Sequence, residues 1–389
     1  MNFSRSSVAD HLPVCALAAA LGIALAGCNP KDGVREYADG LAAYEARSLE
    51  KAGKLFAKSV AYAPGNVDAL VMLARVQCDL GAMSDAGDTI AKAVALAPDA
   101  PDVALLDAEI ALYAGDIARA VSRFTAVAED AKLDPSARAL GWAGLGIVEM
   151  TRDRRDFARI AFLRAIRLDR RNASARYHLG LLYRGDEYGY LDAALEQFEI
   201  FVRLGETADP RAVHVQRVII PGIKADIARR AAERPGAQRR DANASAAALA
   251  RAEAAWKKGS LKAARDEYAA AYKADVLSYP AALGLAKAWE KTDSTAAGRQ
   301  KALDSYKAAC ALRPGAIATF LAAGELAAKI GQHATALELY SRAVAANPAD
   351  ISAIDGLIRA LRKVGGKDNA KVADAYQSYR DSLSARKSK

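Results

Sequence analysis

Side chains that could carry out chemistry are few and lie far apart in this chain. Four histidines and four cysteines occur among its 389 residues. His178, His214 and His333 have no cysteine or carboxylate partner at the spacing of metal ligands, and neither Cys78 nor Cys310 belongs to a CxxC motif. HExxH, GxSxG and phosphate-binding loop motifs are absent from the sequence. The sequence therefore predicts no catalytic residue, no metal site and no cofactor.

One cysteine does stand where covalent modification is expected. A short polar leader containing Arg5 precedes an apolar run from Leu12 to Ala26, and small residues end the run. This three-part layout is typical of a secretory signal, and the run is too short to span a bilayer. Its last residues, Leu25-Ala26-Gly27-Cys28, resemble the bacterial lipobox. The alternative is plain signal cleavage, with Cys28 an incidental cysteine.

The lipobox resemblance implies a cell-envelope protein. It makes residues 1–27 a lipoprotein signal peptide, Cys28 the site of attachment of lipid (palmitate and related acyl chains), and 28–33 a tether. It also implies a location facing the periplasm. Asn29 is not the aspartate that signals inner-membrane retention in such proteins, so the outer membrane is favoured.

The rest of the chain shows an internal repeat that indicates helix pairs. Pro64 and Pro98 are 34 residues apart, and so are Pro314 and Pro348. The residue before a proline avoids the helical region, so each proline closes a unit. The segment from Trp142 to Ala165 carries the fullest motif, W-x2-L-G followed by A-x3-F. This motif and period resemble the tetratricopeptide repeat (TPR) family, which implies an all-α solenoid of helix pairs.

Residue sizes at fixed offsets fit this interpretation. Small residues recur where the first helix of a pair must approach the second, at Gly40, Ala74, Ala108, Gly146, Gly180, Ala252, Gly284 and Gly324. A left-handed C-terminal cap is expected at Gly81, Gly115, Gly259 and Gly331, each seven residues after such a position, and also at Gly365. An alanine followed four residues later by an aromatic residue or isoleucine recurs eight times in the predicted second helices, as in Ala158 and Phe162.

The repeat pattern divides the chain into two arrays with about eight to nine repeats. The predicted parts are an N-terminal TPR array of five repeats (34–208), a non-repeat helix broken near Pro221 with a basic linker (209–243), a C-terminal TPR array of three to four repeats (244–366), and a terminal helix with a basic tail (367–389). The two arrays are expected to be separable at the linker.

In proteins of this family the first helices line a groove, and the resemblance implies which residues contact a ligand. The corresponding offsets select Tyr37, Tyr44, Arg75, Tyr113, Tyr177, Arg184, Trp256 and Trp289. Tyrosine, tryptophan and arginine are common anchors of binding surfaces. The alternative is that these side chains pack between repeats.

Charge bears on the class of partner. Lysine and arginine exceed aspartate and glutamate by 55 − 46 = 9, and basic residues crowd the 209–243 segment. That cluster is interpreted either as a solvated linker or as a contact for an anionic glycan or lipid surface. Nucleic acid is not an expected partner, because the charges are interspersed and the chain carries an export signal.

Taken together, these features predict a lipid-anchored scaffold rather than an enzyme. It would recruit protein partners in envelope assembly, namely a pilus, a secretion apparatus, exopolysaccharide export or outer-membrane assembly. The alternative is a periplasmic solenoid that binds peptidoglycan or an exported polysaccharide.

Overall fold

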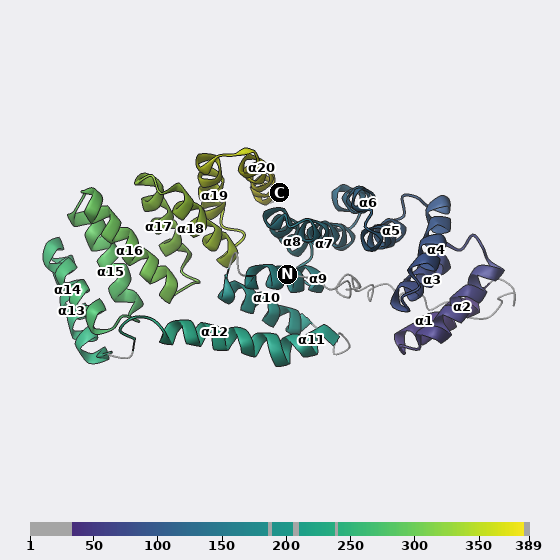
Figure 1. The fold of residues 1–389 in the computed structure, drawn as a ribbon, viewed down its shortest axis with the longest axis horizontal. Helices are drawn as coiled ribbons and strands as arrows, with labels where there is room; N and C mark the ends of the chain where they lie inside the picture. Colours follow the sequence, from purple (N-terminus) through teal and green to yellow (C-terminus); the bar gives the residue numbers. More distant parts are fainter. Residues whose placement is uncertain (1–32, 186–188, 205–209, 238–239, 385–389) are drawn as a thin grey trace. The chain divides into compact units, whose positions relative to one another are not determined.

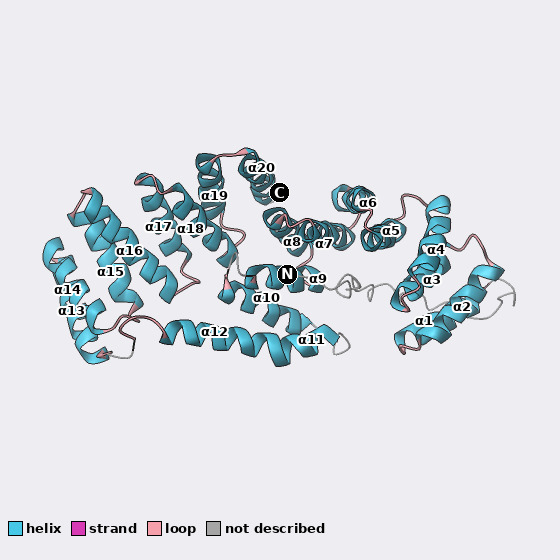
Figure 2. Ribbon diagram, in the orientation of Figure 1, coloured by secondary structure: helices cyan, strands magenta, loops and turns pink. Residues whose placement is uncertain are grey.

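The computed structural model describes residues 33–185, 189–204, 210–237 and 240–384. The predicted signal peptide and Cys28 lie outside this range. Within it, the regular structure consists of helices joined by short turns, and there is no strand (Figure 2). The all-α solenoid fold is confirmed. The chain forms two compact units, here called unit 1, up to His178, and unit 2, from Leu179 onward.

In unit 1 each helix packs against the next along the chain (Figure 1). The helices are α1 Val34–Glu45, α2 Leu49–Tyr62, α3 Val67–Asp79, α4 Met83–Leu96, α5 Pro101–Ala114, α6 Ile117–Glu129, α7 Pro135–Thr151 and α8 Arg155–Leu168, followed by α9 Ala173–Arg184, which continues into unit 2.

The predicted small positions allow the two helices of a pair to approach closely. A Cβ atom on Gly146 of α7 would lie 2.4 Å from Cε1 of Phe162 on α8, and one on Gly40 would lie 2.7 Å from Cε1 of Phe56. Both phenylalanines are fully buried, so neither ring has space to move aside. Glycine at these positions is therefore required by packing.

Four of the five predicted helix caps fit: Gly81, Gly115, Gly259 and Gly331 have φ between 76° and 82°. Gly365 also has a positive φ, of 80°, but its ψ of −173° places it outside the left-handed helical region, so the prediction of a left-handed cap there is wrong. Arg47 and Asp153, which lie seven residues after Gly40 and Gly146, take φ values of 56° and 54° in the equivalent turns. The repeat geometry therefore imposes this conformation even where the residue is not glycine.

Unit 2 begins within α9 and contains both repeat pairs and a non-repeat helix. Its further elements are α10 Leu191–Leu204, α11 Pro210–His214, the π-helix η2 Val215–Ile219, α12 Ile220–Ala232, α13 Ala242–Lys257, α14 Leu261–Ala274, α15 Tyr279–Thr292, α16 Ala296–Leu312, α17 Ile317–Lys329, α18 His333–Ala346, α19 Ile351–Val364 and α20 Lys367–Ser384.

The predicted helix break near Pro221 is wrong. The helix runs without interruption from α11 through η2 into α12. The N–H group of Ile220 donates to the Val215 carbonyl, an i to i+5 bond that widens the turn just before the proline. A π turn accommodates the proline ring and its missing donor, so the helix continues.

The packing partner predicted for Gly284 is wrong as well. A Cβ atom there would lie 2.3 Å from Cε1 of Tyr268, on the second helix of the preceding pair. A Cβ atom on Gly356 would contact Tyr340 of the preceding pair in the same way. Both glycines therefore face the preceding pair, and Gly284 lies two residues before the small position of its own pair. Ala286, which is fully buried, occupies that position instead.

The boundary between the two compact units lies inside α9, upstream of the predicted 209–243 interruption. The helix of that interruption packs against α10 within unit 2. Whether the two predicted arrays fold separately remains a prediction.

Candidate functional site

The predicted groove residues of the first three helix pairs lie on one surface of unit 1, here called the inner-helix face. It is formed by α1, α3 and α5. Its polar and aromatic side chains are Tyr37, Tyr44, Asp68, Arg75, Asp79, Asp102, Glu109 and Tyr113.

Two polar contacts join successive repeats across this face. The Tyr44 hydroxyl donates to Oδ2 of Asp79 at 2.8 Å. Nη1 of Arg75 donates to Oε2 of Glu109 at 3.3 Å, and the Arg75 side chain is only 6% exposed. Tyr44 and Arg75 therefore stabilise the stacking of repeats, which is the alternative that the sequence left open for them.

The ionisation of these groups reflects their burial. Burial raises the pKa of Tyr44, and the Asp79 carboxylate raises it further. Burial alone would lower the pKa of Arg75, but the Glu109 carboxylate and other nearby groups outweigh it and raise the value. Tyr44 thus remains a hydrogen-bond donor and Arg75 remains a cation at neutral pH.

Other groups of the face remain open. Asp68 and Asp102 are exposed, and the Tyr113 side chain is 47% exposed. The protein atoms around Asp102 partly exclude water, which raises its pKa. Arg75 opposes this shift, and the carboxylates of Asp68 and Asp134 add to it. These carboxylates therefore interact across successive repeats, and the open part of the face is acidic with an exposed tyrosine.

Tyr37 belongs to the packed part of the face. It is half-buried, with its ring centroid 5.8 Å from that of Phe56. Burial raises its pKa, and the carboxylates of Asp68 and Asp102 contribute. Tyr37 therefore lies between the packed core and the acidic surface.

The remaining predicted groove residues lie elsewhere. Tyr177 on α9 makes an edge contact with the neighbouring His178 ring at 5.2 Å, and Arg184 is exposed at the end of α9. Trp256 on α13 packs against Tyr268, with 6.3 Å between ring centroids. Their role as ligand contacts remains a prediction.

Trp289 on α15 is covered by cations. The guanidinium of Arg265 lies 4.4 Å from its ring centroid, and Nζ of Lys301 lies 4.6 Å from it. The predicted offset counted Trp289 as five residues after the small position, at Gly284. With Ala286 as the small position, Trp289 lies only three residues after it. It contacts residues of α14 and α16, and its role in ligand binding also remains a prediction.

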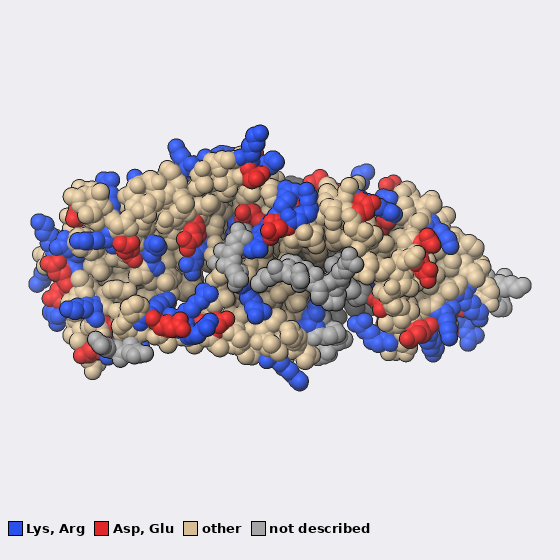
Figure 3. All heavy atoms as spheres, viewed as in Figure 1, with Lys and Arg blue, Asp and Glu red and all other residues tan. Residues whose placement is uncertain are grey.

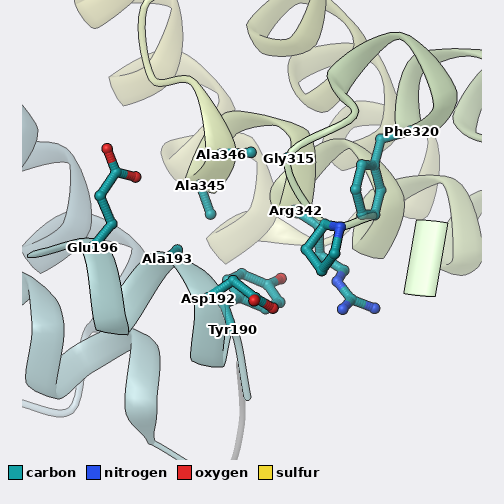
Figure 4. Close-up of a pocket in the computed structure, with 10 residues that line it drawn as sticks. Tyr190, Asp192, Ala193, Glu196, Gly315, Phe320, Arg342, Ala345 and Ala346 are labelled. Carbon is teal, nitrogen blue, oxygen red and sulfur yellow. The ribbon is translucent and has the colours of Figure 1, made fainter. Parts of the chain in front are cut away.

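Sequence reasoning did not anticipate a cleft in unit 2. Its volume is about 100 Å³, and it lies between the start of α10, the turn that joins α16 to α17, and helices α17 and α18 (Figure 4). The lining residues are Tyr190, Asp192, Ala193, Glu196, Pro314, Gly315, Phe320, Arg342, Ala345 and Ala346. The repeat period carried no signal for it, because the cleft joins residues more than a hundred positions apart.

The basic residues of the 209–243 segment are largely paired within unit 2. Arg240 forms two bonds with Asp275, at 2.8 and 3.2 Å, and Lys224 pairs with Glu199 at 2.9 Å. Arg234 donates to the Ala311 carbonyl. Blue and red side chains are accordingly intermixed over α12 (Figure 3). These contacts fix the segment to its neighbours and reduce the charge available to an anionic surface.

Neither metal binding nor membrane crossing is indicated in the part of the chain that the structure describes. No group of three histidine, cysteine or carboxylate residues there could hold a metal ion. No helix there has both the length and the apolar character needed to cross a bilayer. His178 bonds the Ser174 carbonyl through Nδ1 at 2.8 Å and stacks on Phe162, so it packs as a helix residue.

Comparisons with known proteins bear on the repeats. Residues 43–110 match the family model described as a tetratricopeptide repeat. Among solved structures, a thermophilic TPR protein of Thermus thermophilus is 21% identical over 50% of this chain and 99% of its own, with a TM-score of 0.43. Pseudomonas aeruginosa pilF is 19% identical over 50% and 88%, with a TM-score of 0.41. PilW, described as a type IV pilus biogenesis factor, is 13% identical over 53% and 94%, with a TM-score of 0.41. No curated protein matches the chain.

Proposed function

Because this chain is a tetratricopeptide-repeat protein, we propose that it is a lipid-anchored scaffold that binds protein partners of a bacterial envelope machine on the periplasmic side. The repeat supports a role in protein–protein interaction. The Leu25-Ala26-Gly27-Cys28 sequence supports export and anchoring through Cys28, most simply to the outer membrane. A pilus, a secretion apparatus, exopolysaccharide export and outer-membrane assembly all remain open as the machine.

The observation that carries this proposal is the inner-helix face of unit 1. Its open part combines the exposed carboxylates of Asp68 and Asp102 with the 47% exposed ring of Tyr113. Arg75, the nearby cation, is already paired with Glu109. A basic segment of a partner protein would complement this charge, and its aliphatic stems could lie against Tyr113.

The glycan-binding alternative has little support from the two tryptophans predicted to face the groove. A sugar ring would need an accessible aromatic face, but two cations lie over Trp289, and Trp256 packs against Tyr268. Binding of the chain to peptidoglycan or exported polysaccharide is therefore an outcome for the test to exclude.

Site-specific photocrosslinking in intact cells tests the partner surface. A photoreactive residue in place of Tyr113 should capture a defined envelope protein, whereas one in place of Lys92, exposed on the second helix α4, should not. Asp68→Lys together with Asp102→Lys should abolish capture at Tyr113 while leaving the helical content unchanged. Capture that is equal at both positions, or that survives the charge reversal, would contradict the proposed surface.

Membrane fractionation tests the anchor. Cys28→Ser should release the protein from the membrane fraction and stop incorporation of labelled palmitate, because the thiol is the group that takes the thioether-linked lipid. Several acyl chains contribute about 0.8 kcal/mol per buried methylene, so the wild type should withstand a high-salt wash. Retention of the variant after that wash would refute lipid anchoring at Cys28 without bearing on the partner surface.

A further inference from the structure

The cleft of unit 2 brings opposite charges to its two sides. Asp192 and Glu196 lie one turn apart at the start of α10, and Arg342 lies on α18 (Figure 4). Both acidic residues are exposed. The remaining lining is mainly apolar, with alanine side chains from α10 and α18 and the ring of Phe320. The cleft therefore offers a cationic group, the carboxylate of Asp192 with Glu196 at the outer edge, and an apolar wall (Figure 4).

Arg342 is held in place by aromatic rings and keeps its donors available. Its guanidinium carbon lies 5.8 Å from the ring centroid of Tyr190 and 5.5 Å from that of Phe320. Its ion contact is a long one, 3.9 Å to Glu338, whose side chain is 59% exposed. Among the described residues no carbonyl or carboxylate accepts a hydrogen bond from this guanidinium. A planar group held in this way can donate two parallel bonds to a carboxylate.

Asp192 on the other side of the cleft is exposed, yet nearby protein atoms partly exclude water from it, and no cation of the described chain forms an ion pair with it. Burial raises its pKa, and the backbone hydrogen bond of Asp192 and the charges of Arg342 and Arg230 only partly oppose that shift. Asp192 and Arg342 thus influence one another electrostatically, yet within the described chain they do not approach to the 4 Å of an ion pair. A gap separates two groups that would otherwise attract each other.

We propose that this cleft binds a small aliphatic α-amino acid as its zwitterion, with the carboxylate on Arg342 and the ammonium group beside Asp192, while Glu196 adds negative charge at the edge of the cleft. A dipolar ligand bridges the gap and satisfies both sides of it. An inorganic anion would meet two carboxylates, and a simple cation would meet Arg342. The site is distinct from the inner-helix face of unit 1 and does not depend on the scaffold function.

The size and lining of the cleft limit the side chain of the ligand. A volume of about 100 Å³ accommodates only a small molecule. Ala193, Ala345, Ala346 and Phe320 offer apolar contact and no further charge. An aliphatic side chain such as that of leucine is therefore expected to bind better than a charged one.

Calorimetric titration of the purified full chain with L-leucine tests the site. L-leucine should bind, whereas N-acetyl-L-leucine, which lacks the ammonium group, and L-leucinamide, which lacks the carboxylate, should each bind about tenfold or more weakly. Absence of L-leucine binding to the wild type, or equal binding of the three compounds, would overturn the proposal.

Variants then assign the charges. Asp192→Asn should weaken L-leucine binding about tenfold but reduce the affinity for N-acetyl-L-leucine, which lacks the ammonium group, much less. Arg342→Gln should likewise weaken L-leucine binding about tenfold but reduce the affinity for L-leucinamide, which lacks the carboxylate, much less. If Arg342→Gln fails to fold, Glu196→Gln provides an exposed replacement on the ammonium side. Arg362→Gln and Asp374→Asn neutralise an exposed pair between α19 and α20 and serve as matched controls. Equal loss of affinity in controls and cleft variants would contradict the site.

Discussion

The inner helices of the two units use their groove-facing side chains in different ways. In unit 1, side chains from successive repeats bond one another, as Tyr44 does with Asp79 and Arg75 with Glu109. In unit 2, Trp289 lies instead beneath the half-buried Arg265 and the exposed Lys301 of the neighbouring second helices. The offset of a residue within its repeat therefore sets its position on the groove side of the helix. Its neighbours in the adjacent repeats decide whether its side chain is available to a ligand.

Removing one arginine from each unit should give the largest difference. Arg75→Gln leaves the Glu109 carboxylate without its cation in a largely buried position, which should destabilise unit 1 by about 3 kcal/mol. Arg265→Gln removes a surface pair with Asp266 and a contact with Trp289, which should destabilise unit 2 by about 1 kcal/mol or less. Urea unfolding followed by circular dichroism measures both. Equal losses would show that the two inner surfaces are energetically alike.

Filling the small positions should give the next largest effect and also tests whether the units unfold separately. Gly146→Ala places a methyl group against the fully buried Phe162, and Gly284→Ala places one against Tyr268. Overpacking of this kind costs about 1–3 kcal/mol. Gly65→Ala is the matched control, because nothing lies within 4 Å of its added Cβ.

Independent units require that each substitution shifts its own part of the unfolding curve. Hydrogen exchange resolved by residue should show faster opening in α7 and α8 for Gly146→Ala, and in α14 and α15 for Gly284→Ala. Faster exchange throughout the chain in both variants would argue against separable arrays. A Gly65→Ala variant as unstable as the other two would instead assign the losses to glycine replacement in general.

The helix pairs could be predicted from the sequence because their spacing depends on local sizes. Gly146 and Phe162 are sixteen residues apart in one helix pair, and their contact follows from a fixed offset. The same reasoning failed at Gly284, because an irregular pair shifted the alignment by two residues. It failed at Pro221 because a π turn can accommodate a proline within a helix.

The state of the candidate sites could be predicted only in part. The offsets located the inner-helix face, but they did not show that Tyr113 is exposed and Arg75 is buried on that same face. That distinction depends on Glu109, one period downstream, which the offsets alone do not weigh. The cleft around Arg342 depends on how unit 2 brings α10 near α18, and no local pattern encodes that contact.

The smallest effect is expected for the half-buried Tyr44 and the buried Tyr306, since each donates to a carboxylate in a different way. Tyr44 joins two repeats of unit 1 through Asp79, whereas Tyr306 joins the two helices of one pair in unit 2 by donating to Glu290 at 2.9 Å. Burial is the main reason that the pKa of each is raised, and the accepting carboxylate adds to it. Each Tyr→Phe change should cost about 1 kcal/mol at pH 7, because one hydrogen bond is lost.

Raising the pH should remove these contributions. The folded state holds the phenol proton more tightly than the unfolded chain, whose tyrosines titrate near pH 10, so the stabilisation is complete below about pH 10 and is lost as the pH rises toward the folded value. The deficit of Tyr44→Phe and Tyr306→Phe relative to the wild type should therefore shrink at pH 11. Tyr113→Phe is the control, because the Tyr113 hydroxyl bonds no other described residue and the ring is 47% exposed.

In a stack of repeats, weaker coupling between neighbours broadens unfolding, so Tyr44→Phe should lower the slope of the urea transition, while Tyr306→Phe should shift only its midpoint. An unchanged slope in Tyr44→Phe would mean that the Tyr44 to Asp79 bond does not couple the repeats of unit 1.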